Sequence, residues 1–235
     1  MDEKIPLILL PGMLCDGALW QPQIESLADL VTPQIADLTQ DDTIEGMAAR
    51  ILANAPASFA LAGLSMGGYV AQEILRQAPA RVLRLALLDS SARADTPDQA
   101  SKRRGTIELS EKGEFHGVTQ RLLPFLLHPK HLSDNALTGT VMGMTSRVGK
   151  LAFQRQQTAL IGRRDGRQDL TRIACPTLIL CGREDAMTPP KLHQEMADLV
   201  PSARLAIVEE CGHLSTLEQP QAVNAELRTW LMTQE

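Results

Sequence analysis

The chain has 235 residues, 44% of them hydrophobic and 22% charged, so it can bury one large core and has neither a disordered nor a fibrous composition. Its net charge of −5 argues against nucleic acid and against an anionic membrane surface as partners, because both are bound through clustered basic residues. Its four cysteines include no Cys-x-x-Cys pair, so we expect buried thiols in a reducing compartment, with no metal site and no disulfide framework.

Short apolar runs alternate with helical patterns along most of the chain. Several runs are apolar almost throughout, which is typical of parallel strands that are covered on both faces. The alternation predicts an α/β fold with a mostly parallel, doubly wound sheet of about six strands. In chain order, the predicted elements are a strand at Ile5–Leu10, a helix at Leu19–Leu30, a strand at Val31–Ala36, a helix at Ile44–Ala53, a strand at Ser58–Gly63, a helix at Met66–Gln77, strands at Val82–Asp89 and Pro176–Cys181, a helix at Pro190–Leu199, a strand at Arg204–Val208 and a helix at Leu217–Met232.

The order of the strands in the sheet follows from the first of them. If the sheet begins with Ile5–Leu10, the expected order is 2-1-3-4-5-6, which reverses between the first and third strands. Pro33 lies inside the second strand and lacks a backbone donor, so this strand suits an edge of the sheet. Open α/β sheets bind ligands in the crevice at such a reversal, so we expect the site there.

One interval, residues 92–170, contains no convincing strand. Its helical patterns are interrupted by glycines and prolines, and it is too long for a plain loop. We therefore predict a helical lid inserted between the fourth and fifth strands, with residues 1–91 and 171–235 forming the α/β core.

The predicted lid differs from the core in charge. Residues 92–170 hold 13 Lys and Arg and 8 Asp and Glu, a net +5, whereas the rest of the chain is net −10. One interpretation is a solvated helical surface. The other is a positive lid that attracts an anionic substrate, with Arg103, Arg104, Arg121 and Arg147 as the residues most open to that role.

The strongest motif is Gly63-Leu64-Ser65-Met66-Gly67, between a predicted strand and a predicted helix. In this setting G-x-S-x-G forms a nucleophile elbow, a sharp turn that holds the serine in an unfavourable backbone conformation. The N-terminus of the following helix stabilises negative charge beside the serine. We predict that Ser65 is a nucleophile; the alternative is a structural turn.

A serine hydroxyl needs a base, and His213 is the best placed of the five histidines. It follows the last predicted strand and therefore lies at the same edge of the sheet as the elbow. The other histidines are His116, His128 and His131 in the predicted lid, and His193 in a helical pattern where we expect a solvated side chain.

The acid that orients the histidine is also expected after a strand. Asp185 follows the fifth predicted strand and is our assignment for this acid. The alternatives are Asp89, which ends the fourth predicted strand, and Glu184, which is adjacent to Asp185.

A tetrahedral oxyanion requires two hydrogen-bond donors. The backbone N–H of Met66, directly after the predicted nucleophile, would supply one. The loop Pro11–Gly17 follows the first strand and would flank the same crevice, so we predict that the backbone N–H of Met13 supplies the other. The alternative is that Pro11-Gly12 forms only a turn.

Three segments together resemble the α/β-hydrolase superfamily: the elbow, the Gly-x-x-Asp-x-x-x-Pro spacing of Gly182–Pro189, and the Gly212-His213 loop. The order serine, aspartate, histidine along the chain also matches that superfamily. The resemblance covers nearly the whole chain and is greatest to small bacterial carboxylesterases, enol-lactonases and carbon–carbon bond hydrolases. The chain departs from the superfamily in having Pro11-Gly12 where members usually have His-Gly, and in lacking the two strands that usually come first.

The resemblance implies a cofactor-free reaction on a small ester-type substrate, the hydrolysis of a carboxylic ester through an acyl-enzyme. A lactone, a thioester or a carbon–carbon bond cleaved by the same triad is an alternative. A ligand receptor on a hydrolase scaffold is another. The substrate and the oligomeric state stay open at this point, since this fold carries many chemistries.

The apolar run Ile5–Leu14 lacks the features of a signal peptide, because acidic residues precede it and Pro11-Gly12 interrupts it. No stretch approaches the roughly 20 apolar residues that span a bilayer. We therefore expect a cytoplasmic protein.

Overall fold

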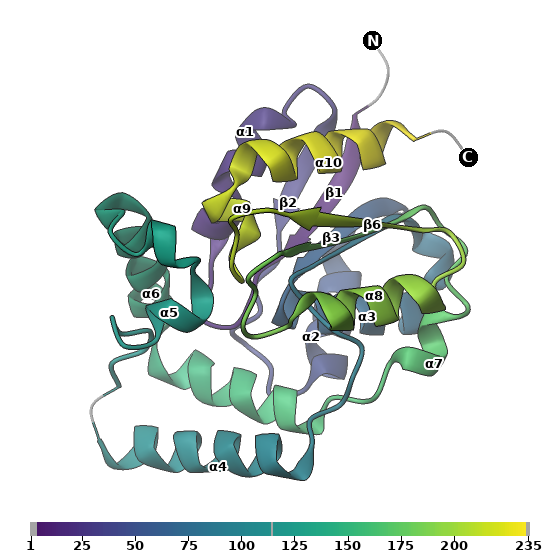
Figure 1. Cartoon of the computed structure of the whole chain (residues 1–235). Helices are drawn as coiled ribbons and strands as arrows, with labels where there is room; N and C mark the ends of the chain where they lie inside the picture. The colour runs from purple at the N-terminus through teal and green to yellow at the C-terminus, as the bar shows by residue number, and fades with distance from the viewer. Residues whose placement is uncertain (1–3, 114, 234–235) are drawn as a thin grey trace.

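The computed structural model describes residues 4–113 and 115–233; Asp2 and Glu3, two of the acidic residues that argue against a signal peptide, lie outside them. Within this part of the chain six strands form one sheet in the order β2-β1-β3-β4-β5-β6, and all neighbouring pairs are parallel (Figure 1). The predicted parallel sheet and its strand order are confirmed. The strands are β1 (Ile5–Leu10), β2 (Val31–Ile35), β3 (Phe59–Leu64), β4 (Val82–Leu88), β5 (Thr177–Gly182) and β6 (Ala203–Val208).

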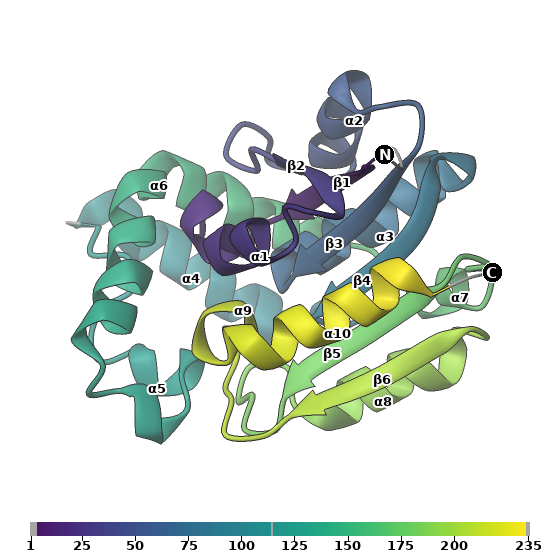
Figure 2. The ribbon, with the colours of Figure 1, turned by 90° about the horizontal axis from the view of Figure 1, so that it is seen from above.

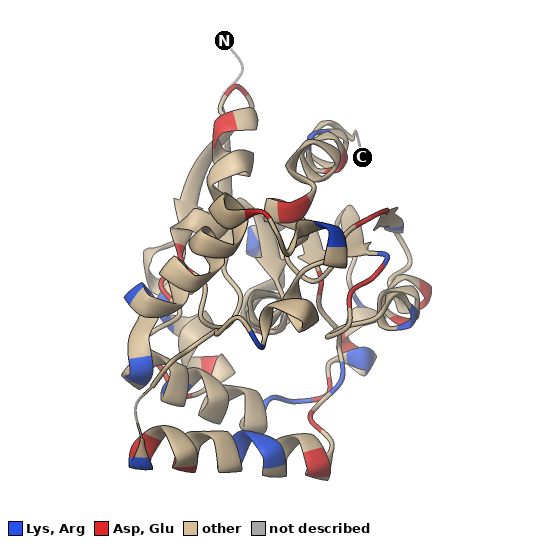
Figure 3. Ribbon diagram, turned by 60° about the vertical axis from the view of Figure 1, so that its left-hand side comes forward, with Lys and Arg blue, Asp and Glu red and all other residues tan. Residues whose placement is uncertain are grey.

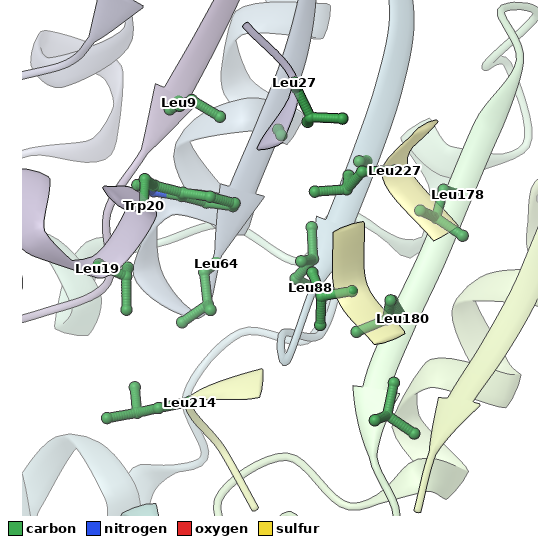
Figure 4. Packing of buried hydrophobic residues seen from close by; sticks show 14 of the residues in the cluster. Leu9, Leu19, Trp20, Leu27, Leu64, Leu88, Leu178, Leu180, Leu214 and Leu227 are labelled. Atoms are coloured by element: carbon green, nitrogen blue, oxygen red, sulfur yellow. The ribbon is translucent and has the colours of Figure 1, made fainter. Parts of the chain in front are cut away.

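The strands are apolar almost throughout because both faces of the sheet are buried. Leu7 and Leu9 of β1 pack into one apolar cluster, whereas Ile8 and Leu10 pack into another on the opposite face. Figure 4 shows the first cluster, in which leucines of β1, β3, β4 and β5 meet Trp20 and neighbouring leucines. Among the strands of the described residues, β2 pairs with β1 alone and lies at the edge of the sheet, as Pro33 predicts.

Helices cover both faces of the sheet. The first face, turned to the viewer in Figure 2, carries α1 (Gln21–Ser26), α9 (Ser215–Glu218) and α10 (Pro220–Met232), and the second carries α2 (Ile44–Asn54), α3 (Met66–Gln77) and α8 (Pro190–Leu199).

Two predicted helices are divided in the structure. The predicted helix Leu19–Leu30 is a 3₁₀ turn at Gly17–Trp20 followed by α1. The predicted helix Leu217–Met232 is split into α9 and α10 just before Pro220, because proline cannot donate the hydrogen bond that would continue a helix.

The interval between β4 and β5 holds α4 (Pro97–Lys112), α5 (Leu123–Leu126), α6 (Asn135–Gly162) and α7 (Arg167–Leu170). Helices α4, α5 and α6 lie beyond the arrowheads of β5 and β6 in Figure 2, which is the end of the sheet where the elbow lies. Helix α6 is kinked at Gly149, whose φ of 76° is a left-handed conformation that glycine adopts readily. Helix α7 instead contacts α3 and α8.

A lid over residues 92–170 stays a prediction, now with α4 to α6 as its helices. In the part of the chain that the structure describes, no helix combines the length and the apolar character needed to cross a membrane.

Candidate active site

Ser65 occupies a strained turn between β3 and α3. Its backbone has φ 52° and ψ −114°, a conformation that a serine rarely adopts. The turn is closed tightly: a Cβ on Gly63 would collide with the Gly67 carbonyl, and a Cβ on Gly67 would collide with the Leu10 carbonyl at the end of β1. Only glycine fits at these two positions, so the motif residues hold the serine on top of the sheet.

His213 reaches this serine from the loop that follows β6. Its Nε2 lies 2.9 Å from Ser65 Oγ, and its side chain is buried. The loop is fixed from two sides, because the backbone N–H of His213 donates to the Leu126 carbonyl and that of Gly212 donates to Glu218 Oε1, both at 2.9 Å. The histidine ring is therefore held where it can accept the serine proton.

Asp185 contacts the other nitrogen of the same ring. Its two carboxylate oxygens lie 3.0 and 2.9 Å from His213 Nδ1. The carboxylate is itself held, since it accepts hydrogen bonds from the backbone N–H groups of Met187 and Thr188 at 2.8 Å and from the Thr188 hydroxyl at 2.7 Å. Because a carboxylate can only accept, Nδ1 carries the proton and Nε2 is free to accept one from Ser65.

The charges of this pair shift both pKa values. Burial alone would lower the pKa of His213, but the charge of Asp185 and its hydrogen bond outweigh burial and raise it above its usual 6.5. Burial alone would raise the pKa of Asp185, but the charge of His213 and the hydrogen bonds from His213 and Thr188 hold it below its usual range. An ionised aspartate beside a basic imidazole is the arrangement that favours proton transfer from serine.

The alternative acids have other partners. Asp89 is fully buried and accepts hydrogen bonds from the Gly182 N–H at 3.1 Å and from the Ser215 N–H and hydroxyl at 3.2 and 2.5 Å. It thereby joins the end of β4 to the end of β5 and to α9. Burial and the nearby Asp185 raise the pKa of Asp89 to about 8. Glu184 accepts from the Cys211 N–H at 3.0 Å. Of the three acids, Asp185 is the one that the fold brings to His213.

The expectation of a solvated His193 is wrong. Its side chain is fully buried, and its Nε2 accepts a hydrogen bond of 2.8 Å from the backbone N–H of Ser90, just after β4. Burial lowers the pKa of His193 to about 4, so the ring is neutral. The helical pattern of α8 placed it among polar neighbours, but the contact with Ser90 comes from a segment about a hundred residues away and leaves no local signature.

The two predicted oxyanion donors come from segments that both lie close to Ser65. Met66 is the first residue of α3, so its N–H has no partner within that helix. The loop that carries Met13 passes close by, since a Cβ on Gly12 would lie only 3.4 Å from the Ser65 Cβ. Both Met13 and Ser65 line one small cavity.

A residue that the sequence did not reveal holds this loop in place. Gln156 of α6 is fully buried; its Oε1 accepts from the Leu14 N–H at 3.0 Å and its amide donates to the Leu38 carbonyl at 3.1 Å. Leu14 has a positive φ of 60°, so the loop needs an outside partner to hold its shape. In the sequence, Gln156 is a polar residue among apolar neighbours of a helix, which indicates a buried polar contact but does not identify Leu14 as the partner.

Two adjoining cavities open onto the candidate site. A small one of about 60 Å³ contains Ser65 and His213, and a larger one of about 380 Å³ lies beneath α4 to α6. The residues that both cavities share are Met13, Leu14, Val118, Leu126 and Met187. The larger cavity is mainly apolar, with Phe115, Phe125 and Phe153 in its lining.

The four arginines considered for an anionic substrate are not among the residues that line these cavities. Arg147 pairs with Asp16, and Arg103 pairs with Asp95. Arg104 and Arg121 are exposed. Among the described residues that line the two cavities there is no lysine or arginine. Figure 3 shows acidic and basic residues mixed along α4. The structure therefore favours the solvated surface over the positive lid that attracts an anionic substrate.

The four cysteines form no disulfide among the described residues. Cys181 and Cys211 are buried and Cys15 and Cys175 are partly buried, all as free thiols. Burial, with Asp16 nearby, raises the pKa of Cys15 to about 12. Over residues 4–113 and 115–233, no three His, Cys, Asp or Glu side chains gather closely enough to hold a metal ion.

The chain is similar to known proteins over nearly its whole length. Residues 7–226 match the model of a family described as the alpha/beta hydrolase family. A pimeloyl-[acyl-carrier protein] methyl ester esterase of Nitrosomonas europaea is 27% identical over 242 aligned positions, which cover 92% of this chain and 91% of that protein.

Solved structures of other proteins also superpose on nearly the whole chain. A thermophilic esterase from Thermogutta terrifontis superposes with a TM-score of 0.87 at 28% identity, over 97% of this chain and 89% of the other. An enol-lactonase from Burkholderia xenovorans LB400 superposes with a TM-score of 0.83, over 98% of this chain and 92% of the other. The sequence identity to this enol-lactonase is 19%, so the likeness there is one of fold.

Proposed function

The chain belongs to the alpha/beta hydrolase family, and from this premise we propose that it hydrolyses a carboxylic ester with Ser65 as nucleophile, His213 as base and Asp185 as the acid that orients the base. The observation that carries the proposal is the continuous set of contacts from Ser65 Oγ to His213 Nε2, at 2.9 Å, and from His213 Nδ1 to Asp185, at 2.9 Å. The esterase relatives support the same reaction.

The first half of the reaction forms an acyl-enzyme. Ser65 Oγ attacks the ester carbonyl carbon while its proton passes to His213 Nε2. The carbonyl electron pair moves to the oxygen, and the backbone N–H groups of Met66 and Met13 donate hydrogen bonds to that oxyanion. When the tetrahedral species collapses, the carbon–oxygen bond to the alcohol breaks and His213 returns the proton to the leaving alkoxide.

The second half releases the acid. A water molecule gives a proton to His213 Nε2 and attacks the acyl carbonyl, forming a second tetrahedral species at the same two donors. Its collapse breaks the bond to Ser65, which takes the proton back from His213. Throughout, Asp185 keeps the Nδ1 proton on the imidazole and stabilises the imidazolium.

The cavities indicate which part of the ester is recognised. The larger cavity has a volume of about 380 Å³, within the range of small-molecule sites, and its lining is apolar and aromatic. It suits an uncharged apolar group, whereas the small cavity at Ser65 leaves room for a compact one. We therefore propose an uncharged ester that is bulky and apolar on one side of the scissile bond.

The experiment is a panel of p-nitrophenyl esters with graded acyl chains, run together with a fluorophosphonate that labels active serines. Ser65→Ala should lower kcat by about 10³-fold or more and abolish labelling, because the nucleophile acts as a unit with its base. Ser58→Ala changes an exposed serine next to β3 and should behave like the wild type. Labelling of Ser65 without turnover of any acyl ester would instead favour a ligand receptor on this scaffold.

A further inference from the structure

Thr145 of α6 is a buried threonine in the cavity of the nucleophile, and its hydroxyl has no hydrogen-bond partner in the described part of the chain. It is 2% exposed, it lines the small cavity that contains Ser65 and His213, and its hydroxyl oxygen contacts no donor or acceptor among the described residues. Its methyl group faces Gly117, where an added Cβ would collide with it. The hydroxyl therefore does not point toward the loop that contains Gly117.

The other threonines of this helix behave differently. Thr138, Thr140 and Thr158 each donate to the carbonyl four residues earlier, at 2.9 Å. This bond is the usual way in which a helical threonine satisfies its hydroxyl. Thr145 does not make it, although it is the most deeply buried of the four.

A buried hydroxyl without a hydrogen-bond partner destabilises the folded chain. We therefore expect the Thr145 hydroxyl to form a hydrogen bond when a ligand is bound. The cavity around Thr145 is otherwise lined mainly by apolar side chains such as Val118, Leu126 and Val141. A substrate bound beside Ser65 displaces water from this cavity and can itself supply a partner for the hydroxyl.

We propose that Thr145 is a substrate-binding residue whose hydroxyl hydrogen-bonds an oxygen of the substrate close to the scissile carbonyl. The inference rests on the proposed ester hydrolysis and makes it more specific: the preferred ester carries an ether or hydroxyl oxygen on the compact side of the carbonyl. The small volume of the cavity, about 60 Å³, places that oxygen within a few bonds of the reacting carbon. Thr145 sets specificity and takes no proton in the reaction.

Two pairs of nearly isosteric p-nitrophenyl esters test the proposal. Methoxyacetate is compared with butyrate, and 3-hydroxybutyrate with 3-methylbutyrate; within each pair an oxygen replaces a carbon. The quantity measured is the ratio of kcat/KM for the oxygenated ester to that for its carbon analogue. This ratio is internal to each enzyme, so partial loss of folded protein does not alter it.

The wild type should prefer the oxygenated member of at least one pair, and Thr145→Val should reduce that ratio by about five- to tenfold. Thr145→Ser keeps a hydroxyl and should retain the preference. Thr158→Val makes the same change at an exposed position of α6 and should leave the ratio unchanged. The Tm of Thr145→Val should equal or exceed that of the wild type, because the variant removes an unsatisfied buried group.

An unchanged ratio in Thr145→Val, a wild type without preference in either pair, or a lowered Tm in Thr145→Val would each overturn the proposal. Failure of the proposed function looks different: no ester of either pair would be hydrolysed at all, or Ser65→Ala would hydrolyse them as fast as the wild type.

Discussion

Asp185 and Asp89 both follow strands and are both buried, yet only Asp185 contacts His213. Asp185→Asn should favour the wrong imidazole tautomer and lower kcat by about 10⁴-fold, if the loss known from serine proteases applies. Asp89→Asn should keep kcat/KM within about tenfold of the wild type, because Asp89 accepts hydrogen bonds from Gly182 and Ser215 and does not contact His213. It should instead lower the Tm, because Ser215 loses an acceptor. The opposite pattern of activities would assign the acid to Asp89.

The raised pKa of His213 determines how activity depends on pH. The base must be neutral to accept the serine proton, and the charge of Asp185 keeps the imidazole protonated to a higher pH than usual. The kcat/KM should therefore rise with pH through an apparent pKa above 6.5 and level off on the alkaline side. A pH–rate profile on a neutral ester measures this value. An apparent pKa below 6.5 in the profile would contradict the conclusion that the charge of Asp185 outweighs the burial of His213.

At the scale of elements, α6 supports the loop after β1 through a single side chain, Gln156. Gln156→Leu leaves the Leu14 N–H and the Leu38 carbonyl without their partner, so the Met13 N–H should lose its position. The expected result is a fall in kcat of about 10- to 100-fold, somewhat below the loss of a whole oxyanion donor, with little change in KM. Steady-state kinetics with a short-chain ester separate the two constants.

Gln168→Leu makes the same change at an exposed position and serves as the control for Gln156→Leu. A rise in KM at constant kcat for Gln156→Leu would show that Gln156 affects the binding of the substrate in its ground state. It would contradict the proposal that Gln156 positions the Met13 N–H.

The elements of the sheet could be predicted because their signals are local. Apolar runs mark the strands, the motif around Ser65 marks the elbow, and Pro33 marks the edge strand. The contacts that the sequence did not reveal join distant segments: His193 with Ser90, and Gln156 with Leu14. Helical periodicity reports which face of a helix is apolar, but it does not report which loop a buried polar group on that face will meet. Polar side chains in such contacts resemble surface residues in the sequence.

At the scale of the whole molecule, the predicted lid and the core differ in charge. Among the described residues, however, no lysine or arginine lines the cavities at the candidate site. Arginine–carboxylate pairs such as Arg147 with Asp16 occupy the surface, while the cavities are apolar. A p-nitrophenyl hexanoate should therefore be hydrolysed at least about tenfold faster, in kcat/KM, than the p-nitrophenyl monoester of adipate, because an ionised carboxylate is costly to bury without a partner. Both rates should depend only weakly on ionic strength.

A preference for the adipate ester that weakens at high salt would restore the positive lid as a device that attracts anionic substrates. Substitution of Arg104 and of Arg121, two exposed arginines of that set, would then test which side chain is responsible.

Trapping the acyl-enzyme tests the role of Ser65 most directly. Wild-type protein is mixed rapidly with a p-nitrophenyl ester, quenched in acid and digested, and the peptide that contains Ser65 is analysed by mass spectrometry. The proposed reaction should give a burst of p-nitrophenol and an acyl group on Ser65, with both absent in Ser65→Ala. An acyl group on another residue, or an equal burst from Ser65→Ala, would contradict it.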